Sequence, residues 1–553
     1  MFTSLNTGYP STHVVKSIKN KILSLFEISQ ESVAAEREMD AKINVLIEDF
    51  LSENNISSDI NCKSLSEKFT DSKAVLEPDD IDSYIDELSE HIVSHSIHTS
   101  SPRFIGHMTA ALPYFVRPLT KLMTAMNQNT VKTETAKALT PYERQVLAKI
   151  HRLIYSFSDE FYLQHIQNAQ STLGLVVSGG TIANITALWC ARNNSLGSKD
   201  SFTGVENEGL AAALNFYGYN EAVVIGSSLM HFSFEKAVDI LGIGTRGLIK
   251  IPANRKNQID LQALRQTVAT CRARNQHIIA IVGVAGTTDS GGIDSLSDIA
   301  QIAKEANVHF HVDAAWGGPV IFSKKHRHKL AGIEQADSVT IDGHKQMYLP
   351  MGIGMLLLRD PQKAKVIEKQ ASYTVRKESI DLGKRSLEGS RPGTALLLNA
   401  GLNLIGVNGY EFLINEGIRK TQYMAERIFA LPEFELLAEP EINLLIYRYI
   451  PEPFREHAEQ GELTKTDNKL INKFNQQIQK SQRHAGRTFI SRTTTNTTRY
   501  GQDVPLVVLR AVIANPLTIE DDIDAVLNEQ IKIGMELSRE LCFTPTKKLI
   551  KNS

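Results

Sequence analysis

Short apolar runs alternate with amphipathic stretches from about residue 170 onward. Residues 296–306, between two of these runs, carry apolar side chains at helical spacing. Near-continuous apolar strands separated by helices are typical of a mainly parallel sheet that is covered on both faces. The pattern therefore predicts a large α/β domain built on such a sheet. The apolar runs lie at residues 174–177, 221–225, 277–284, 308–312, 338–341 and 354–358.

The two ends of the chain depart from this alternation. Residues 1–105 follow a helical pattern that is interrupted by polar stretches. After about residue 400 the alternation is less regular, with strand patterns at 443–449 and 505–513, and polar residues 452–490 that suit either a helical excursion or a mobile segment. We therefore expect a helical segment at 1–105, a large domain at 106–400 and a small α/β domain at 401–553.

Composition and charge exclude several classes of protein. Of 553 residues, 42% are hydrophobic and 22% charged, and the formal net charge is −2, so there is no electrostatic reason to expect nucleic acid or an anionic membrane as partner. The start of the chain lacks the pattern of a signal peptide, and no apolar run is long enough to span a bilayer. The 4 cysteines are scattered, which predicts reduced thiols and no metal site. We expect a cytoplasmic protein.

Small and reactive residues follow several of the predicted strands. Gly180 and Thr181 begin a helical stretch, where backbone N–H groups suit a phosphate. Thr288 follows the run at 277–284, and Asp313 follows the run at 308–312. The carboxyl ends of parallel strands share one edge of the sheet, where α/β proteins bind ligands. Lys345, after the run at 338–341, would face the same edge, and a lysine there can form a Schiff base with a carbonyl compound.

Taken in order, these segments resemble a known family. The order Gly-Gly-Thr (179–181), His231, Gly-Thr-Thr (286–288), His-Val-Asp-Ala-Ala (311–315) and Gly-His-Lys (343–345) is similar to that of the group II decarboxylases, which use pyridoxal 5′-phosphate (PLP) and have the fold-type I PLP architecture. The resemblance covers roughly residues 100–535 and includes residues 101–107. Within the family it is nearest to a bacterial, glutamate-decarboxylase-like branch of aspartate 1-decarboxylases.

The resemblance implies a role for each matching residue. Lys345 would hold the cofactor as a Schiff base, Asp313 would pair with its pyridine nitrogen, and His231 would stack on its ring and serve catalysis. Tyr373 would deliver a proton to the substrate carbon from a mobile loop. Further cofactor contacts would come from Gly180, Thr181, Thr288, Ala315 and His344, and the substrate contacts from His107, Arg510 and, with weaker support, Arg391.

Two departures from glutamate decarboxylases bear on the substrate. Asp342-Gly343 stands where those enzymes have Asn-Pro, and His107 stands where they have a glutamine that contacts the substrate. We expect decarboxylation of L-aspartate to β-alanine, which would supply pantothenate synthesis, with L-glutamate to GABA as the alternative. An aminotransferase on the same fold, or a binding protein that has lost the chemistry, would keep Lys345 and Asp313. The resemblance also implies a homodimer.

Two other motifs have simpler explanations than the binding of a dinucleotide, a metal ion or nucleic acid. Residues 242–247 satisfy G-x-G-x-x-G, but they follow a helical stretch and precede a strand, the reverse of the order in dinucleotide-binding proteins. The basic run at 324–329 lacks interleaved aromatic residues and further metal ligands, so it is typical of a solvated surface.

Overall fold

The computed structural model describes residues 20, 22–370, 378–496, 500 and 504–540. Backbone contacts divide the chain into two compact units, Met1–His98 and Thr99–Ser553. The first unit is helical, as expected, with α2 (Gln30–Ser52), α3 (Cys62–Lys68) and α4 (Ile81–Glu87). Because the division falls after His98, the boundaries expected at residues 105 and 400 remain predictions.

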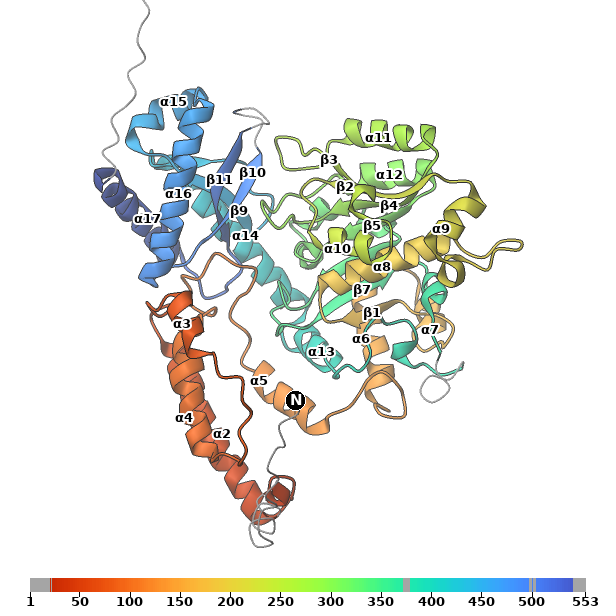
Figure 1. Ribbon diagram of the computed structural model, residues 1–553, viewed down its shortest axis with the longest axis horizontal. Coiled ribbons are helices and arrows are strands. Elements are labelled where there is room, and N and C mark those ends of the chain that lie inside the picture. Colours follow the sequence, from red (N-terminus) through yellow and green to blue (C-terminus); the bar gives the residue numbers. More distant parts are fainter. Residues whose placement is uncertain (1–19, 21, 371–377, 497–499, 501–503, 541–553) are drawn as a thin grey trace, which may run out of the picture. The chain divides into compact units, whose positions relative to one another are not determined.

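A seven-stranded sheet forms the centre of the second unit (Figure 1). Its strand order is β1-β7-β6-β5-β4-β2-β3, and only β7 runs antiparallel to its neighbours. The mainly parallel sheet that the apolar runs predict is therefore confirmed. The strands are β1 (Gly174–Val177), β2 (Glu221–Ser227), β3 (Leu248–Ile251), β4 (Gln276–Val284), β5 (His309–Asp313), β6 (Ser338–Asp342) and β7 (Gly354–Leu358).

Helices cover both faces of this sheet, which explains why its strands are almost uninterruptedly apolar. In β4, Ile281 packs in one core cluster with α6, α11 and α12, whereas Ala280 and Val282 pack in another with α8 and α10. Successive strand residues point to opposite faces, so each strand needs apolar side chains on both. The helices of this part are α5 (Val116–Met126), α6 (Leu139–Tyr155), α7 (Asp159–His165), α8 (Gly180–Ser195), α9 (Val205–Tyr217), α10 (Ser233–Ile240), α11 (Leu261–Ala273) and α12 (Leu296–Ala306).

The C-terminal part of the same unit carries a smaller antiparallel sheet with the order β10-β11-β9-β8. The two late strand patterns are confirmed as β9 and β11, and the polar stretch between them contains α15 and α16. The elements are α13 (Ala395–Leu404), α14 (Gly406–Ala430), β8 (Phe434–Leu436), β9 (Leu444–Tyr449), α15 (Arg455–Gln460), α16 (Lys465–Ala485), β10 (Ser491–Asn496), β11 (Pro505–Val512) and α17 (Glu520–Glu540).

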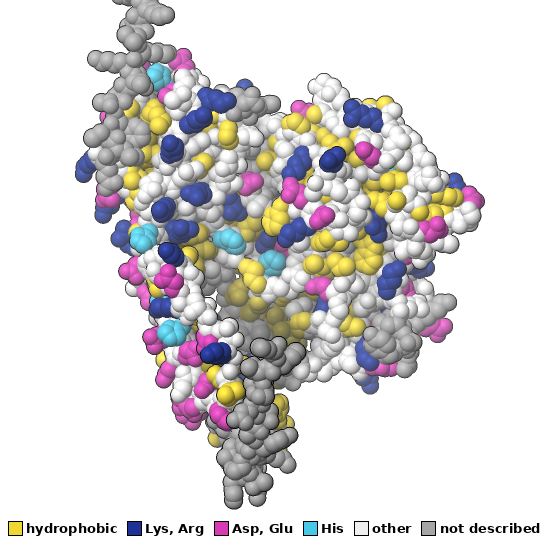
Figure 2. Space-filling view, in the orientation of Figure 1, with side chains coloured by type: hydrophobic (Ala, Val, Ile, Leu, Met, Phe, Trp, Pro, Cys, Tyr) yellow, Lys and Arg dark blue, Asp and Glu magenta, His cyan; other side chains and the backbone are white. Residues whose placement is uncertain are grey.

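The fold can be compared with the expectations for the G-x-G-x-x-G motif, membrane spans, metal sites and surface charge. Residues 242–247 lie between α10 and β3, so their order is that of helix, turn and strand. Within the described residues, no helix is long and apolar enough to cross a membrane, and no group of side chains is arranged to bind a metal ion. On the face drawn in Figure 2, basic and acidic side chains are interspersed with hydrophobic ones.

Candidate active site

A cavity of about 390 Å³ lies where β4, β5 and β6 end. These three strands are parallel neighbours in the order β6-β5-β4, so residues that follow them in sequence meet at one edge of the sheet. Most of the predicted site residues line this cavity. They are Gly180, Thr181, His231, Thr288, Asp313, Ala315, His344 and Lys345.

Asp313 ends β5 and is only 6% exposed. Its Oδ2 accepts a hydrogen bond of 3.0 Å from Asn184 Nδ2, and its Oδ1 accepts one of 3.1 Å from the backbone N–H of Ala315. These two hydrogen bonds hold the carboxylate in one orientation. The cavity therefore has a fixed negative charge at the end of its central strand.

His231 lies between β2 and α10 on the wall of the cavity. Its Nδ1 is 3.2 Å from the backbone N–H of Ser233 and accepts that hydrogen, which leaves Nε2 to carry the ring proton. Burial lowers the pKa of His231, and the charge of Asp313 opposes this effect. A neutral ring with a fixed tautomer suits stacking on an aromatic cofactor.

Lys345 reaches Asp342 rather than solvent. Its Nζ lies 3.0 Å from Asp342 Oδ2, and His344 Nε2 lies 3.6 Å from the same oxygen. His344 Nδ1 is held by the carbonyl of Ile353 at 2.8 Å. The side chain of Asp342 is 3% exposed, and its Oδ1 is buried without a hydrogen-bond partner. The acid that departs from the glutamate-decarboxylase pattern is therefore a charge partner of the site lysine.

Gly179 and Gly180 allow the start of α8 to approach β6 and β7 closely. A Cβ atom on Gly180 would lie 3.0 Å from Asp342 Oδ2 and 3.3 Å from the Ala315 Cβ, and a Cβ on Gly354 would lie 2.6 Å from Gly179 Cα. The first backbone N–H groups of α8 have no partner within the helix. Small residues are therefore needed here for α8 to start against these strands, at the wall of the cavity.

Arg510 extends from β11 and is 8% exposed. Its Nε donates to the carbonyl of Thr288 at 2.7 Å, and its Nη1 donates to the carbonyl of Gly106 and to Ser491 Oγ at 3.3 and 3.0 Å. No hydrogen bond of its Nη2 is recorded among the described residues. Arg510 itself does not line the cavity, but its anchor on Thr288 joins it to the cavity wall.

His107 is held near Arg510 by the backbone that precedes it. Ile105 donates its N–H to the carbonyl of Phe489 at 3.1 Å and accepts from Val512 N–H at 2.7 Å, so the segment pairs with the smaller sheet. Burial lowers the pKa of His107, and the positive charges of Arg510 and Lys345 lower it further. His107 is exposed and does not line the cavity, and its ring is a neutral donor or acceptor.

Arg391 has a different environment from the one expected. Its Nη1 and Nη2 donate to the two carboxylate oxygens of Glu143 on α6, at 3.2 and 2.7 Å, and neither residue lines the cavity. The planar end of its guanidinium is thus already occupied by a protein carboxylate, which argues against the expected contact with a substrate. Tyr373, the expected proton donor, lies outside the described residues.

The donor set fits PLP, the cofactor that the resemblance implies. The aldehyde needs an amine (Lys345), the ring nitrogen an acid (Asp313) and the phosphate the N–H groups at the glycine-rich start of α8. Asp342 Oδ1, which is buried without a hydrogen-bond partner, is an acceptor and therefore contributes nothing to binding the phosphate.

Sequence reasoning missed Asn184. It lies in α8, 1% exposed, and donates to Asp313 and to Ser233 Oγ. The signal was present, because an asparagine inside the apolar stretch 182–188, one turn after the predicted phosphate turn, needs buried hydrogen-bond partners.

The comparisons with known proteins agree with this geometry. Residues 64–450 match the pyridoxal-dependent decarboxylase conserved domain. The chain is 45% identical to an aspartate 1-decarboxylase of Aliivibrio fischeri over 505 residues, 90% of this chain and 91% of the relative. It is 27% identical to an L-2,4-diaminobutyrate decarboxylase of Acinetobacter baumannii, over 66% of this chain and 70% of that protein. The crystal structure of mouse CSAD in its apo form superposes with a TM-score of 0.78 at 22% identity, covering 91% of this chain and 99% of that chain. Because the conserved domain matches residues 64–450 and the first relative is 45% identical over 90% of this chain, the chain belongs to the pyridoxal-dependent decarboxylase family.

Proposed function

We propose that this pyridoxal-dependent decarboxylase converts L-aspartate to β-alanine. The bond between Cα and the α-carboxylate breaks, CO₂ leaves, and a proton takes its place on Cα. The observation that carries this proposal is the buried Arg510, whose Nη2 remains available beside the cavity that holds Lys345. The Nε and Nη1 groups of Arg510 hold the guanidinium in place, so its Nη2 can donate a charged hydrogen bond to a carboxylate of the amino-acid substrate.

The chain's own residues prepare the site. Bound PLP supplies an electron sink for the electron pair that remains when CO₂ leaves. Lys345 attaches the cofactor, and the Asp313 carboxylate, held by Asn184 and Ala315 N–H, keeps a proton on the ring nitrogen. The imidazole of His231, on the cavity wall, would stack on the cofactor ring and hold it in place. Tyr373 remains our candidate for protonating Cα.

Aspartate is preferred to glutamate for two reasons. The relative that is 45% identical over 90% of this chain is named as an aspartate 1-decarboxylase. In addition, the charges of Arg510 and Lys345 help to keep the ring of His107 neutral. A neutral imidazole can donate a hydrogen bond to a substrate carboxylate. Family membership favours decarboxylation over the aminotransferase alternative.

We also propose that the active form is a cytoplasmic homodimer. Within its own unit α2 buries none of its residues, and the apolar side chains of Met39, Val45 and Leu51 are 38%, 56% and 39% exposed. A 23-residue helix that buries no apolar residue gains little from its own unit, so a second copy would stabilise it. Light scattering at micromolar concentration tests this proposal, and a monomer that is fully active would refute it.

The experiment for the substrate measures CO₂ release by the PLP-loaded protein with aspartate, glutamate and 2,4-diaminobutyrate in parallel, and identifies each amine product. We expect β-alanine from aspartate to form fastest. GABA as the main product would keep the decarboxylase chemistry and refute aspartate as the substrate. Transfer of the amino group to a keto acid, without CO₂, would refute the proposed reaction.

A further inference from the structure

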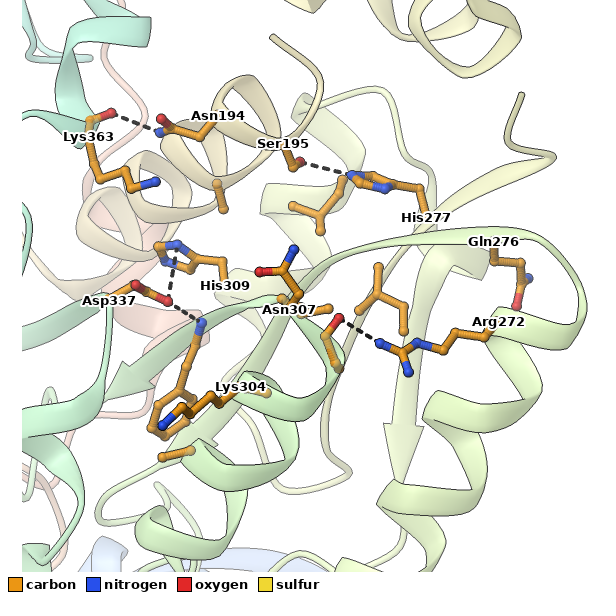
Figure 3. A pocket seen from close by; sticks show the side chains of 18 of the residues that line it. Asn194, Ser195, Arg272, Gln276, His277, Lys304, Asn307, His309, Asp337 and Lys363 are labelled. Atoms are coloured by element: carbon orange, nitrogen blue, oxygen red, sulfur yellow. Dashed lines mark hydrogen bonds and ion pairs between the residues drawn. The ribbon is translucent and has the colours of Figure 1, made fainter. Parts of the chain in front are cut away.

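A second and larger cavity, of about 900 Å³, lies at the opposite edge of the seven-stranded sheet (Figure 3). Gln276 and His309 begin β4 and β5, Asp337 immediately precedes β6, and all three residues line this cavity. We call it the amino-edge cavity. It faces the amino ends of the strands whose carboxyl ends form the candidate active site.

The lining of the amino-edge cavity is rich in positive charge. It contains Arg272, Lys304, Arg359 and Lys363, against the single acid Asp337. Among the described residues, no ion pair is recorded for Lys304, Arg359 or Lys363. The C-terminal ends of α8, α11 and α12 also face this edge and carry partial negative charge, but they offset only about half of the net side-chain charge.

The size and mixed lining of the cavity suit an organic anion rather than a bare ion. Figure 3 shows Lys363, His309, Asp337 and Lys304 along one side. Apolar side chains, including Ile279, Ala303 and Phe310, also contribute to the lining. Cavities of several hundred Å³ are typical sites for small molecules, and the more polar lining of this one suits a charged ligand.

A chain of hydrogen bonds connects this cavity to Asp313 in the candidate active site. His309 Nε2 lies 2.8 Å from Ser338 Oγ, which in turn lies 2.8 Å from His311 Nδ1. His311 Nε2 is 3.0 Å from Asn184 Oδ1, and Asn184 Nδ2 donates to Asp313 over 3.0 Å. The middle of the chain is buried, with His311 and Ser338 0% exposed and Asn184 1%.

The chemistry of these groups fixes the direction of every hydrogen bond. The amide of Asn184 donates to the Asp313 carboxylate, so its Oδ1 faces His311 and His311 Nε2 must carry a hydrogen. Burial lowers the pKa of His311 to about 3, so the ring is neutral and its Nδ1 accepts the hydroxyl hydrogen of Ser338. Ser338 has no other hydrogen to give, so His309 Nε2 must donate to it. All donors therefore point toward Asp313.

This direction leaves His309 Nδ1 as the one nitrogen of that ring that can gain a proton. It lies 3.9 Å from Asp337 Oδ2. Burial lowers the pKa of His309, Asp337 opposes this effect, and the charge of Lys363 adds to it. An anion paired with Lys363 would remove the repulsion from Lys363 and favour a protonated His309. A charged ring is the stronger donor to Ser338, and each donor after it then stabilises the Asp313 carboxylate more.

We propose that the amino-edge cavity is a regulatory site for a small organic anion carrying phosphate or carboxylate groups, and that its occupancy reaches Asp313 through the chain His309–Ser338–His311–Asn184. The binding part of this proposal is independent of the proposed substrate. The coupling part rests on the proposed role of Asp313 toward the cofactor.

Binding is tested by calorimetric titration of the PLP-loaded, full-length protein with inorganic pyrophosphate and, separately, with citrate. We expect at least one probe to bind, and the probe that binds identifies the acid group that the site prefers. The variant Lys304→Ala/Lys363→Ala should bind that probe at least tenfold more weakly. Lys480→Ala, an exposed lysine on α16 outside the cavity, is the matched control and should bind as the wild type does. Failure of both probes to bind, or equal binding by the double variant, overturns the site.

Coupling is tested with Ser338→Ala, which interrupts the chain between the two histidines without touching either cavity. With the bound probe, kcat/KM of the wild type should rise at least twofold, whereas Ser338→Ala should bind the probe and show no rise. An equal rise in both proteins, or none in the wild type, overturns the proposed route. Because binding is measured by heat without substrate, failure of the site is distinguishable from failure of the aspartate assignment.

Discussion

Breaking the Arg391–Glu143 pair should destabilise the protein and leave substrate binding intact. The two side chains are 8% and 1% exposed and are joined by two hydrogen bonds. Arg391→Met removes the cation and leaves the Glu143 carboxylate buried without a partner. Loss of one member of a buried pair costs about 3–5 kcal/mol, whereas replacing both members by apolar side chains is close to neutral. We therefore expect that Arg391→Met/Glu143→Leu recovers most of the stability lost in Arg391→Met.

The assay is urea unfolding of both variants beside the wild type, together with KM for aspartate. A loss of about 3 kcal/mol or more in the single variant, largely absent from the double variant, with KM changed less than about twofold, supports a structural role for Arg391. If instead Arg391→Met unfolds at the wild-type urea concentration and raises KM at least tenfold, the geometric reasoning is refuted and the substrate contact first expected from the sequence is restored.

Four further outcomes are expected. Lys345→Ala should lose covalent attachment of PLP, seen as the loss of the protein-bound chromophore, and should release CO₂ at least ~100-fold more slowly; a variant with the wild-type rate would show that another amine holds the cofactor. His107→Gln should shift the ratio of aspartate to glutamate turnover toward glutamate, and an unchanged ratio would remove His107 from the specificity argument. Arg510→Lys keeps the charge but loses the anchored nitrogens that position Nη2, so kcat/KM for aspartate should fall about 10- to 100-fold, corresponding to about 1.5–3 kcal/mol for a charged hydrogen bond; an unchanged value would contradict the proposed carboxylate contact. Burial lowers the pKa of His151 to about 4 and that of His311 to about 3, so both are neutral when folded. Their contribution to stability is present above the unfolded pKa of about 6.5 and is lost as pH falls, by about 2 kcal/mol each at pH 5; urea unfolding at pH 8 and pH 5 measures this loss, and equal stability at both would refute it.

The sequence predicted those site residues whose positions follow from local order along the chain. Thr288, Asp313 and Lys345 each follow an apolar run, and parallel pairing brings the ends of these runs to one edge of the sheet. Contacts between distant segments could not be read in the same way. The pairing of residues 103–105 with Phe489 and Val512, which brings His107 close to Arg510, depends on how the smaller sheet packs, and no local pattern encodes that packing.

The arginines 391 and 510 show why residue type alone could not settle the site. Both are largely buried, and both suited a substrate carboxylate by sequence. Arg391 gives both its terminal nitrogens to the Glu143 carboxylate, so its charge is neutralised within the protein. The hydrogen bonds of Arg510 instead go to two backbone carbonyls and one hydroxyl, which are uncharged acceptors that fix its position and leave its positive charge uncompensated by direct contact. A buried cation that is held in place and not neutralised costs desolvation energy in the free protein, and it is stabilised when an anion enters. The substrate carboxylate is therefore expected at Arg510 and not at Arg391, because only there does its arrival complete an ion pair that the fold has left open.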